Sequence, residues 1–142
     1  MVVRKFFQCV SHLISATALV GVGYVDGPYA HTLSIVLLTI SVGGAGMTQA
    51  GFMVNHLDLA PKYAGVLLGI TNSFGTIPGF FAPQVTDMIT TADPDTEPEK
   101  LKQQWQTVFY ITAAVYAFGA VFYMTFAQGE LQPWADGAKR TR

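Results

Sequence analysis

Residues 63–86 read YAGVLLGITNSFGTIPGFFAPQVT and contain no Asp, Glu, Lys or Arg. Three further windows share this property, residues 6–25, 27–57 and 103–129. An α-helix of about 20 residues rises about 30 Å, which is the thickness of the hydrocarbon core of a bilayer. Each window is long enough for one crossing. The sequence therefore predicts an all-α membrane protein with four transmembrane helices.

The composition agrees with a membrane protein and excludes several other classes. Apolar residues make up 51% of the chain and charged residues only 12%, whereas soluble domains carry about 25% charged residues. The single cysteine, Cys9, excludes a disulfide framework and a multi-cysteine metal site. No basic patch with interleaved aromatic residues is present, so we expect no nucleic-acid partner.

Enzymatic chemistry is not expected either. The chain has no nucleophile and base pair, no metal-ligand spacing and no phosphate-binding loop. The glycine-rich run at residues 43–46 lies inside an apolar window, where helix packing explains it better than nucleotide binding. We predict no metal and no cofactor.

Turn residues and charges divide the chain into helices and connections. Asp26-Gly27-Pro28 closes the first window, and an acidic, proline-containing run follows the third. Trp105 and Trp134 lie where a helix is expected to meet water. The predicted helices are residues 6–25, 32–54, 63–88 and 105–128. The predicted connections and ends are residues 1–5, 26–31, 55–62, 89–104 and 129–142.

The positive-inside rule orients these helices. With four crossings, both ends and the middle connection share one side of the membrane. Six basic residues lie on that side and two on the other, which predicts cytoplasmic ends and a lumenal or extracellular acidic loop at 89–104. The two sets are Arg4, Lys5, Lys62, Lys139, Arg140 and Arg142 against Lys100 and Lys102.

A cleaved signal peptide is the alternative interpretation of the first window. Arg4 and Lys5 precede an apolar run, and Ala16-Thr17-Ala18 resembles a cleavage site. The apolar run, however, continues through residues 19–25 to a full spanning length. A membrane helix is therefore the preferred interpretation.

Small residues recur at spacings that allow helices to approach closely. Gly65 with Gly69 and Gly75 with Gly79 form two GxxxG pairs in the third window. Pro78 and Pro83 each remove a backbone donor from the same helix and predict kinks. A bent, moving transporter helix and a tightly packed static one are both compatible with this pattern.

Four uncharged polar side chains inside the windows are candidates for lining a polar cavity, namely Gln49, Thr71, Asn72 and Gln84. The alternative is structural, because membrane-embedded hydroxyl groups often bond to their own helix carbonyls. We favour this alternative for Ser73 and Thr76. His12 is interpreted as a structural donor rather than a proton relay.

Several sequence blocks resemble one transporter family. They are NHLDLAPKYAG at 55–65, LGITN at 68–72, TIPG at 76–79, WQTVFYI at 105–111, GE at 129–130 and QPWA at 132–135. Together and in this order they resemble the vesicular anion transporters of solute carrier family 17, with its sialic-acid and phosphate-transporting branches nearest. The resemblance covers almost the whole chain.

The resemblance implies a major facilitator fold, in which two six-helix halves rock around a central site. By this correspondence the four helices are spans nine to twelve of twelve, and the chain is a C-terminal fragment or incomplete gene product. The family's charged binding groups lie mainly on other spans. We therefore expect the chain alone not to transport.

The resemblance also assigns the connection at 55–62 to the inner gate. There Asp58 and Lys62 could form ion pairs that break as the halves rock, and His56 could make a pH-sensitive contact. The structural alternatives are a helix cap for Asp58 and a positive-inside anchor for Lys62.

The function implied by the resemblance is proton-coupled symport of organic anions such as sialic acid or acidic amino acids. Sodium-coupled phosphate transport is the alternative within the family, and a non-transporting four-span scaffold is the alternative outside it. The implied partners are an anionic substrate with H⁺ or Na⁺, the lipid bilayer and the N-terminal helices of the same transporter. The implied location is a lysosomal, vesicular or plasma membrane.

Overall fold

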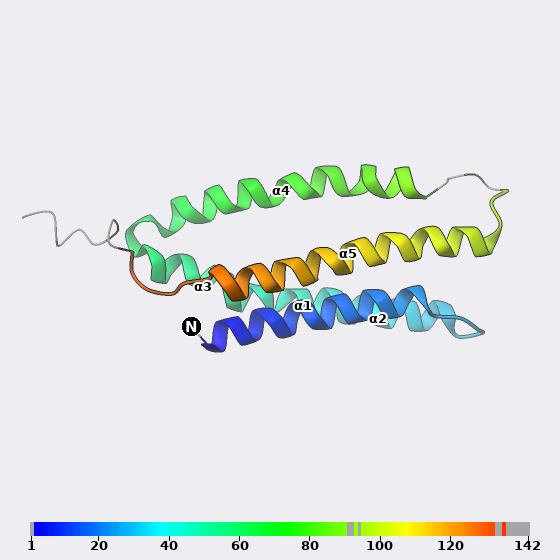
Figure 1. Cartoon of the computed structure of the whole chain (residues 1–142), viewed down its shortest axis with the longest axis horizontal. Helices are drawn as coiled ribbons and strands as arrows, with labels where there is room; N and C mark the ends of the chain where they lie inside the picture. The colour runs from blue at the N-terminus through cyan, green and yellow to red at the C-terminus, as the bar shows by residue number, and fades with distance from the viewer. Residues whose placement is uncertain (1, 91–92, 94, 133–134, 136–142) are drawn as a thin grey trace, which may run out of the picture.

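The computed structural model describes residues 2–90, 93, 95–132 and 135, without the side chains of residues 50, 51, 53 and 54. The described residues form helices and no strand, which confirms the predicted all-α class. Trp134 and the basic residues of the predicted tail lie outside the described residues. The helices are α1 (Val2–Gly23), α2 (Ala30–Gly46), α3 (Thr48–Leu59), α4 (Ala64–Ile89) and α5 (Pro98–Phe126), with a short 3-10 helix, η1 (Pro61–Tyr63), before α4 (Figure 1).

The helices extend beyond the predicted spans. α1 begins at Val2, inside the predicted connection 1–5, and α3 continues to Leu59, inside 55–62. α5 begins at Pro98, where proline is favoured in the first turn, and continues through polar residues with good helix propensity before Trp105. Helix formation therefore does not stop at the edges of the apolar windows, and the depth at which each helix enters the membrane stays a prediction.

Among the described residues, three helical segments are long and apolar enough to cross a bilayer, namely Val2–Gly23, Pro61–Ile89 and Pro98–Phe126. The predicted span at 32–54 is interrupted at Met47 between α2 and α3. Gly43, Gly44 and Gly46 immediately precede this interruption, and glycine weakens a helix. Pro78 and Pro83 do not interrupt α4, so the break lies in a different helix from the one in which kinks were predicted.

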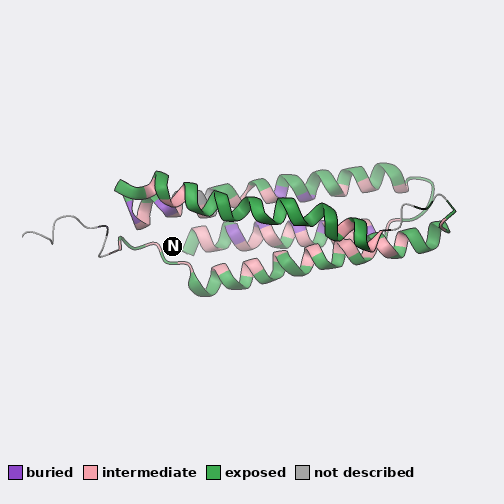
Figure 2. Cartoon of the chain, turned by 90° about the horizontal axis from the view of Figure 1, so that it is seen from above, coloured by how far each residue is buried: buried purple, intermediate pink, exposed green. Residues whose placement is uncertain are grey.

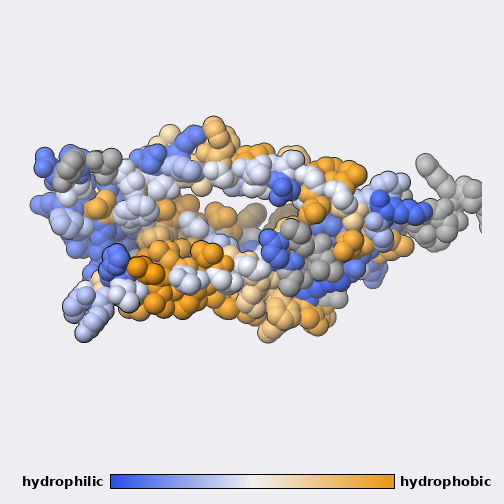
Figure 3. All heavy atoms as spheres, turned by 180° about the vertical axis from the view of Figure 1, so that it is seen from behind, coloured by the Kyte–Doolittle hydropathy of each residue, from blue (hydrophilic) through white to orange (hydrophobic). Residues whose placement is uncertain are grey.

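The described residues bury little apolar side chain and expose much. The buried apolar residues are all alanines, Ala18, Ala60 and Ala135. Large apolar side chains such as Phe74, Phe118 and Met88 are exposed, and Figure 3 shows apolar atoms along the middle of the molecule with polar atoms towards both ends. This inverted distribution suits a protein whose surface faces lipid.

Helix α1 lies between α2 and α5 and holds half of the buried residues in the described part of the chain (Figure 2). Its interface with α2 is polar and close. Ser11 Oγ donates to Gly44 O at 2.7 Å, and Ser15 Oγ donates to Ser41 O at 2.8 Å. A Cβ added at Gly44 would lie 2.8 Å from Ile14 Cγ2, so only glycine fits this contact.

Polar contacts near both ends of α5 hold this helix against α1 and against the turn that follows α1. Lys102 Nζ pairs with Asp26 at 2.5 Å, and Gln106 Nε2 donates to Gly23 O at 2.6 Å. At the opposite end Lys5 Nζ donates to Met124 O at 2.7 Å. By contrast, α4 has no buried residue and lies apart along most of its length (Figure 1).

Candidate functional site

The corner between α3 and α4 contains the predicted gate residue His56. Its side chain is buried, with 9% exposed. The Nδ1 atom lies 3.1 Å from Phe52 O and the Nε2 atom lies 3.1 Å from Thr71 Oγ1. Because a carbonyl only accepts, Nδ1 carries the proton of the neutral ring, which leaves Nε2 as an acceptor for the Thr71 hydroxyl. The same hydroxyl also lies 3.0 and 3.1 Å from Leu67 O and Leu68 O, and its single proton is shared among these three acceptors. This contact joins the predicted gate residue to a predicted cavity residue.

Asp58 neither caps a helix nor pairs with Lys62. It lies inside α3, and neither η1 nor α4 has a side-chain cap. The cap prediction is wrong because α3 continues past residue 55. Asp58 instead forms an ion pair with Arg4 at the start of α1. Both side chains are partly exposed, at 38% and 24%, so the pair contributes about 0–1 kcal/mol.

Lys62 lies in η1 and is exposed, and no ion pair to it occurs among the described residues. The nearby α3 terminus is closed by the chain after α5, because Gln132 N donates to Leu59 O at 3.0 Å. Arg4 and Gln132 therefore both hold the corner, a role that the sequence did not predict for either residue.

The four predicted cavity residues do not converge on one site. Gln49, Thr71, Asn72 and Gln84 are all exposed, and none of them lines the cavities described below. Gln84 Nε2 donates to its own helix at Phe80 O, at 3.3 Å. Ser73 and Thr76 bond back to Gly69 O and Ser73 O at 2.9 and 2.7 Å, as the structural interpretation of these two hydroxyls predicts.

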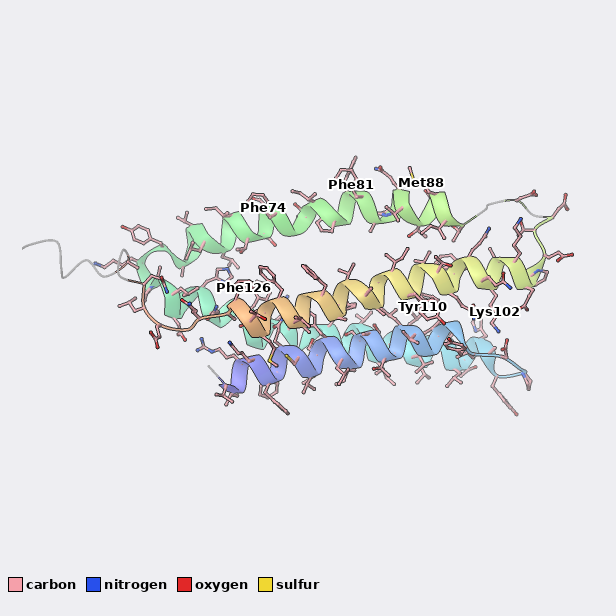
Figure 4. The ribbon with its side chains drawn as sticks, viewed as in Figure 1. Phe74, Phe81, Met88, Lys102, Tyr110 and Phe126 are labelled. Carbon is pink, nitrogen blue, oxygen red and sulfur yellow. The ribbon has the colours of Figure 1, made fainter. Side chains whose placement is uncertain are left out.

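The GxxxG pairs of α4 face open space within this chain. A Cβ added at Gly65, Gly69, Gly75 or Gly79 would meet no atom within 4 Å. At 100° per residue, one stripe of α4 contains small and polar residues, while Phe74 and Met88 lie on the other side, away from α5 (Figure 4). The stripe consists of Gly65, Gly69, Asn72, Thr76, Gly79 and Pro83.

Two cavities flank α5. One of about 600 Å³ lies between α4 and α5 and is mostly apolar, with Pro78, His12 and Tyr116 among its lining residues. His12 Nδ1 lies 2.9 Å from Gln8 O, which agrees with the interpretation as a structural donor. The second, of about 460 Å³, lies where α3, α4 and α5 approach one another and is lined in part by Asn55, Gln128 and Gln132.

These features define an all-α, multi-pass integral membrane protein with exposed apolar helices. No protein-family model matches the chain. Individual relatives do, since the chain is 44% identical to sialin of Homo sapiens over 133 residues. It is 42% identical to vesicular glutamate transporter 2 of Bos taurus over 136 residues and 40% identical to vesicular glutamate transporter 1 of Xenopus laevis over 134 residues.

Each alignment covers 94% of this chain but only 25%, 21% and 22% of the respective relative. The chain thus spans about a quarter of the length of these relatives or less. Over that part the chain is similar to sialin and to the vesicular glutamate transporters, in line with the predicted resemblance to solute carrier family 17. The relatives carry the names of transporters and not of enzymes, in line with the prediction of no enzymatic activity.

Proposed function

We propose that this chain is the four-helix, C-terminal part of a sialin-like secondary active anion transporter. The observation that carries the proposal is the alignment of 94% of the chain with about a quarter of sialin. In the intact transporter the substrate is an organic anion such as sialic acid or an acidic amino acid, moved together with protons.

The proposed role of the four helices is to form part of the cavity wall and not to bind the charge of the anion. The apolar windows contain no Arg or Lys to pair with an anion inside the membrane. Substrate charge is therefore neutralised by helices outside this chain. Packing against those helices also covers the exposed glycines of α4.

The small and polar stripe of α4 is the surface proposed to face the rest of the transporter. Glycine lets a second helix approach closely, and Asn72 offers an amide that apolar lipid cannot satisfy. Gln49, Thr71 and Gln84 remain candidates for the polar path, although Thr71 and Gln84 lie outside the stripe. The corner with His56, Asp58 and Lys62 is proposed to move when the transporter changes conformation.

The test is uptake by the full-length protein in proteoliposomes. Uptake of labelled sialic acid driven by an acidic exterior, with no sodium-driven phosphate uptake, supports the proposal. Phosphate uptake with no organic-anion uptake would assign the protein to the alternative branch, and no uptake of either anion would favour the scaffold.

A substitution in the stripe tests the orientation of α4 in the same assay. Asn72→Leu is expected to lower sialic-acid uptake at least tenfold at equal protein amount. The matched control is Met88→Leu on the exposed apolar side of α4, which we expect to leave uptake unchanged. Unchanged uptake in Asn72→Leu would show that this face of α4 does not border the path.

A further inference from the structure

The cavity of about 600 Å³ between α4 and α5 has apolar walls that this chain leaves exposed. Val85 on α4 and Val115 on α5 both line it and are 44% and 65% exposed. The lining residues extend over 78–89 of α4 and 108–119 of α5. At 1.5 Å per residue each wall is about 16 Å long, which is roughly half the thickness of the hydrocarbon core. Helix α4 lies apart from α5 here and does not close the space (Figure 1).

His12 reaches this cavity from a third helix. It belongs to α1, yet it lines the cavity between α4 and α5. A Cβ added at Gly119 of α5 would lie 3.2 Å from His12 Nε2, so glycine at this position leaves room for the imidazole ring. The ring is perpendicular to that of Tyr116, with the two centres 5.4 Å apart. Because His12 lies near the middle of α1, the cavity has a polar group near the predicted centre of the membrane.

The polar group that His12 presents is an acceptor. Its Nδ1 atom lies 2.9 Å from Gln8 O and carries the proton of the neutral ring, which leaves Nε2 to accept. Two hydroxyls of the lining, Thr86 and Thr112, donate to carbonyls four residues earlier in their own helices, at 3.0 and 2.9 Å. Tyr116 has the remaining hydroxyl, and no hydrogen bond from it to Nε2 occurs in the described part of the chain.

We propose that this cavity receives a transmembrane helix from the part of the transporter outside this chain, with a hydrogen-bond donor that faces His12 Nε2. The inference rests on the proposed function, because it requires the larger transporter of which the chain matches about a quarter. Lipid is the competing occupant. Acyl chains cover apolar walls but carry no donor for Nε2, whereas a Ser, Thr, Asn, Gln or Tyr side chain on a helix does both.

Photocrosslinking of the full-length protein in its membrane tests the occupant. Val115→p-benzoylphenylalanine places a photoreactive ketone on the cavity wall. The matched control is the same substitution at Val121, which is 66% exposed on the same helix and lines neither cavity described above. At position 115 we expect crosslinks to a peptide of the same molecule outside residues 1–142, several-fold more often than at position 121.

The other products of this experiment would overturn the proposal. Adducts with lipid assign the cavity to lipid, and a crosslinked dimer assigns it to a second copy. Products confined to residues 1–142 would mean that α4 itself closes on α5.

Thermal unfolding covers the case in which the large probe prevents folding. Val115→Ala is expected to lower the melting temperature of the full-length protein by several degrees, because it leaves a void beneath the bound helix. Val121→Ala is expected to leave the melting temperature unchanged. Equal shifts in the two variants would overturn the proposal.

A double-mutant cycle tests the hydrogen bond. The crosslinked helix is expected to carry a donor side chain, and its replacement by an apolar residue of similar volume is combined with His12→Leu. We expect the two losses in melting temperature to be less than additive, and Tyr116→Phe to leave the melting temperature unchanged. A crosslinked helix without such a donor, or additive losses, would overturn the proposal. Uptake is not measured in these experiments, so a negative result here leaves the proposed transport function standing.

Discussion

Among the glycines that the structure describes, Gly44 on α2 is the one at which an added Cβ would come nearest to another helix. Its backbone carbonyl accepts from Ser11, and the space beside its Cα is filled by Ile14 and Ser15. Gly43, one residue earlier, has no atom within 4 Å of an added Cβ. Packing against α1 thus requires glycine at position 44 but not at position 43.

Gly44→Ala is expected to destabilise the protein by about 1–3 kcal/mol, because Ile14 is stiff and must shift to admit a methyl group. Gly43→Ala is the control and is expected to be neutral or slightly stabilising, since alanine favours helix. Thermal unfolding in detergent measures both. Equal melting temperatures for the two variants would contradict the packing of α1 on α2.

The ion pair Arg4–Asp58 predicts a charge-swap result. Arg4→Asp and Asp58→Arg each place like charges together and are expected to destabilise by up to about 1 kcal/mol, given the partial exposure of both groups. The double variant restores opposite charges and is expected to recover most of the loss. Strictly additive losses in a double-mutant cycle would show that the two residues do not interact.

Among the helices, α4 differs from the rest. Like α5 it buries no residue, but unlike α5 it is not held against α1, and a polar contact that joins it to α3 is Thr71 with His56. By contrast, α1 and α5 are fixed to each other at both ends. The chain thus consists of a group formed by α1, α2, α3 and α5 and of one helix, α4, that lies apart from this group along most of its length (Figure 1).

Thr71→Val is expected to loosen the start of α4, because His56 Nε2 loses its partner while side-chain volume is conserved. Hydrogen exchange at the first turns of α4 should become several-fold faster. Thr76→Val is the control, since Thr76 bonds only within its own helix. The same increase in both variants would mean that the His56 contact does not hold α4.

The helical element type follows from the sequence, because an uncharged segment of about 20 residues has one common solution in lipid. The positions of the helix ends could not be predicted from the sequence. The sequence places Asp58 in a connection because Asn55 and His56 precede it and Pro61 follows it, yet α3 continues to Leu59. The partner of Asp58, Arg4, is 54 positions away in sequence, and local pattern carries no signal for such a contact. The sequence likewise did not predict the break at Met47, because the prolines of α4 are stronger helix-breaking signals than the glycines of α2.

At the scale of the whole molecule, apolar helices with exposed hydrophobic side chains agree with a membrane protein, and the four crossings remain a prediction. The chain aligns along 94% of its length with sialin yet matches only 25% of it. The proposed function therefore depends on how many times the chain crosses the membrane and on which side its connections lie. An even number of crossings places residues 1–5 and the tail on the same side as the corner at Lys62.

Glycosylation mapping tests this claim most directly. An acceptor site inserted at Asp95, in the acidic connection before α5, is expected to be glycosylated in microsomes, whereas one inserted at Lys62 is not. Modification at Lys62 with none at Asp95 would reverse the orientation, and modification at both or at neither would contradict the four-crossing arrangement.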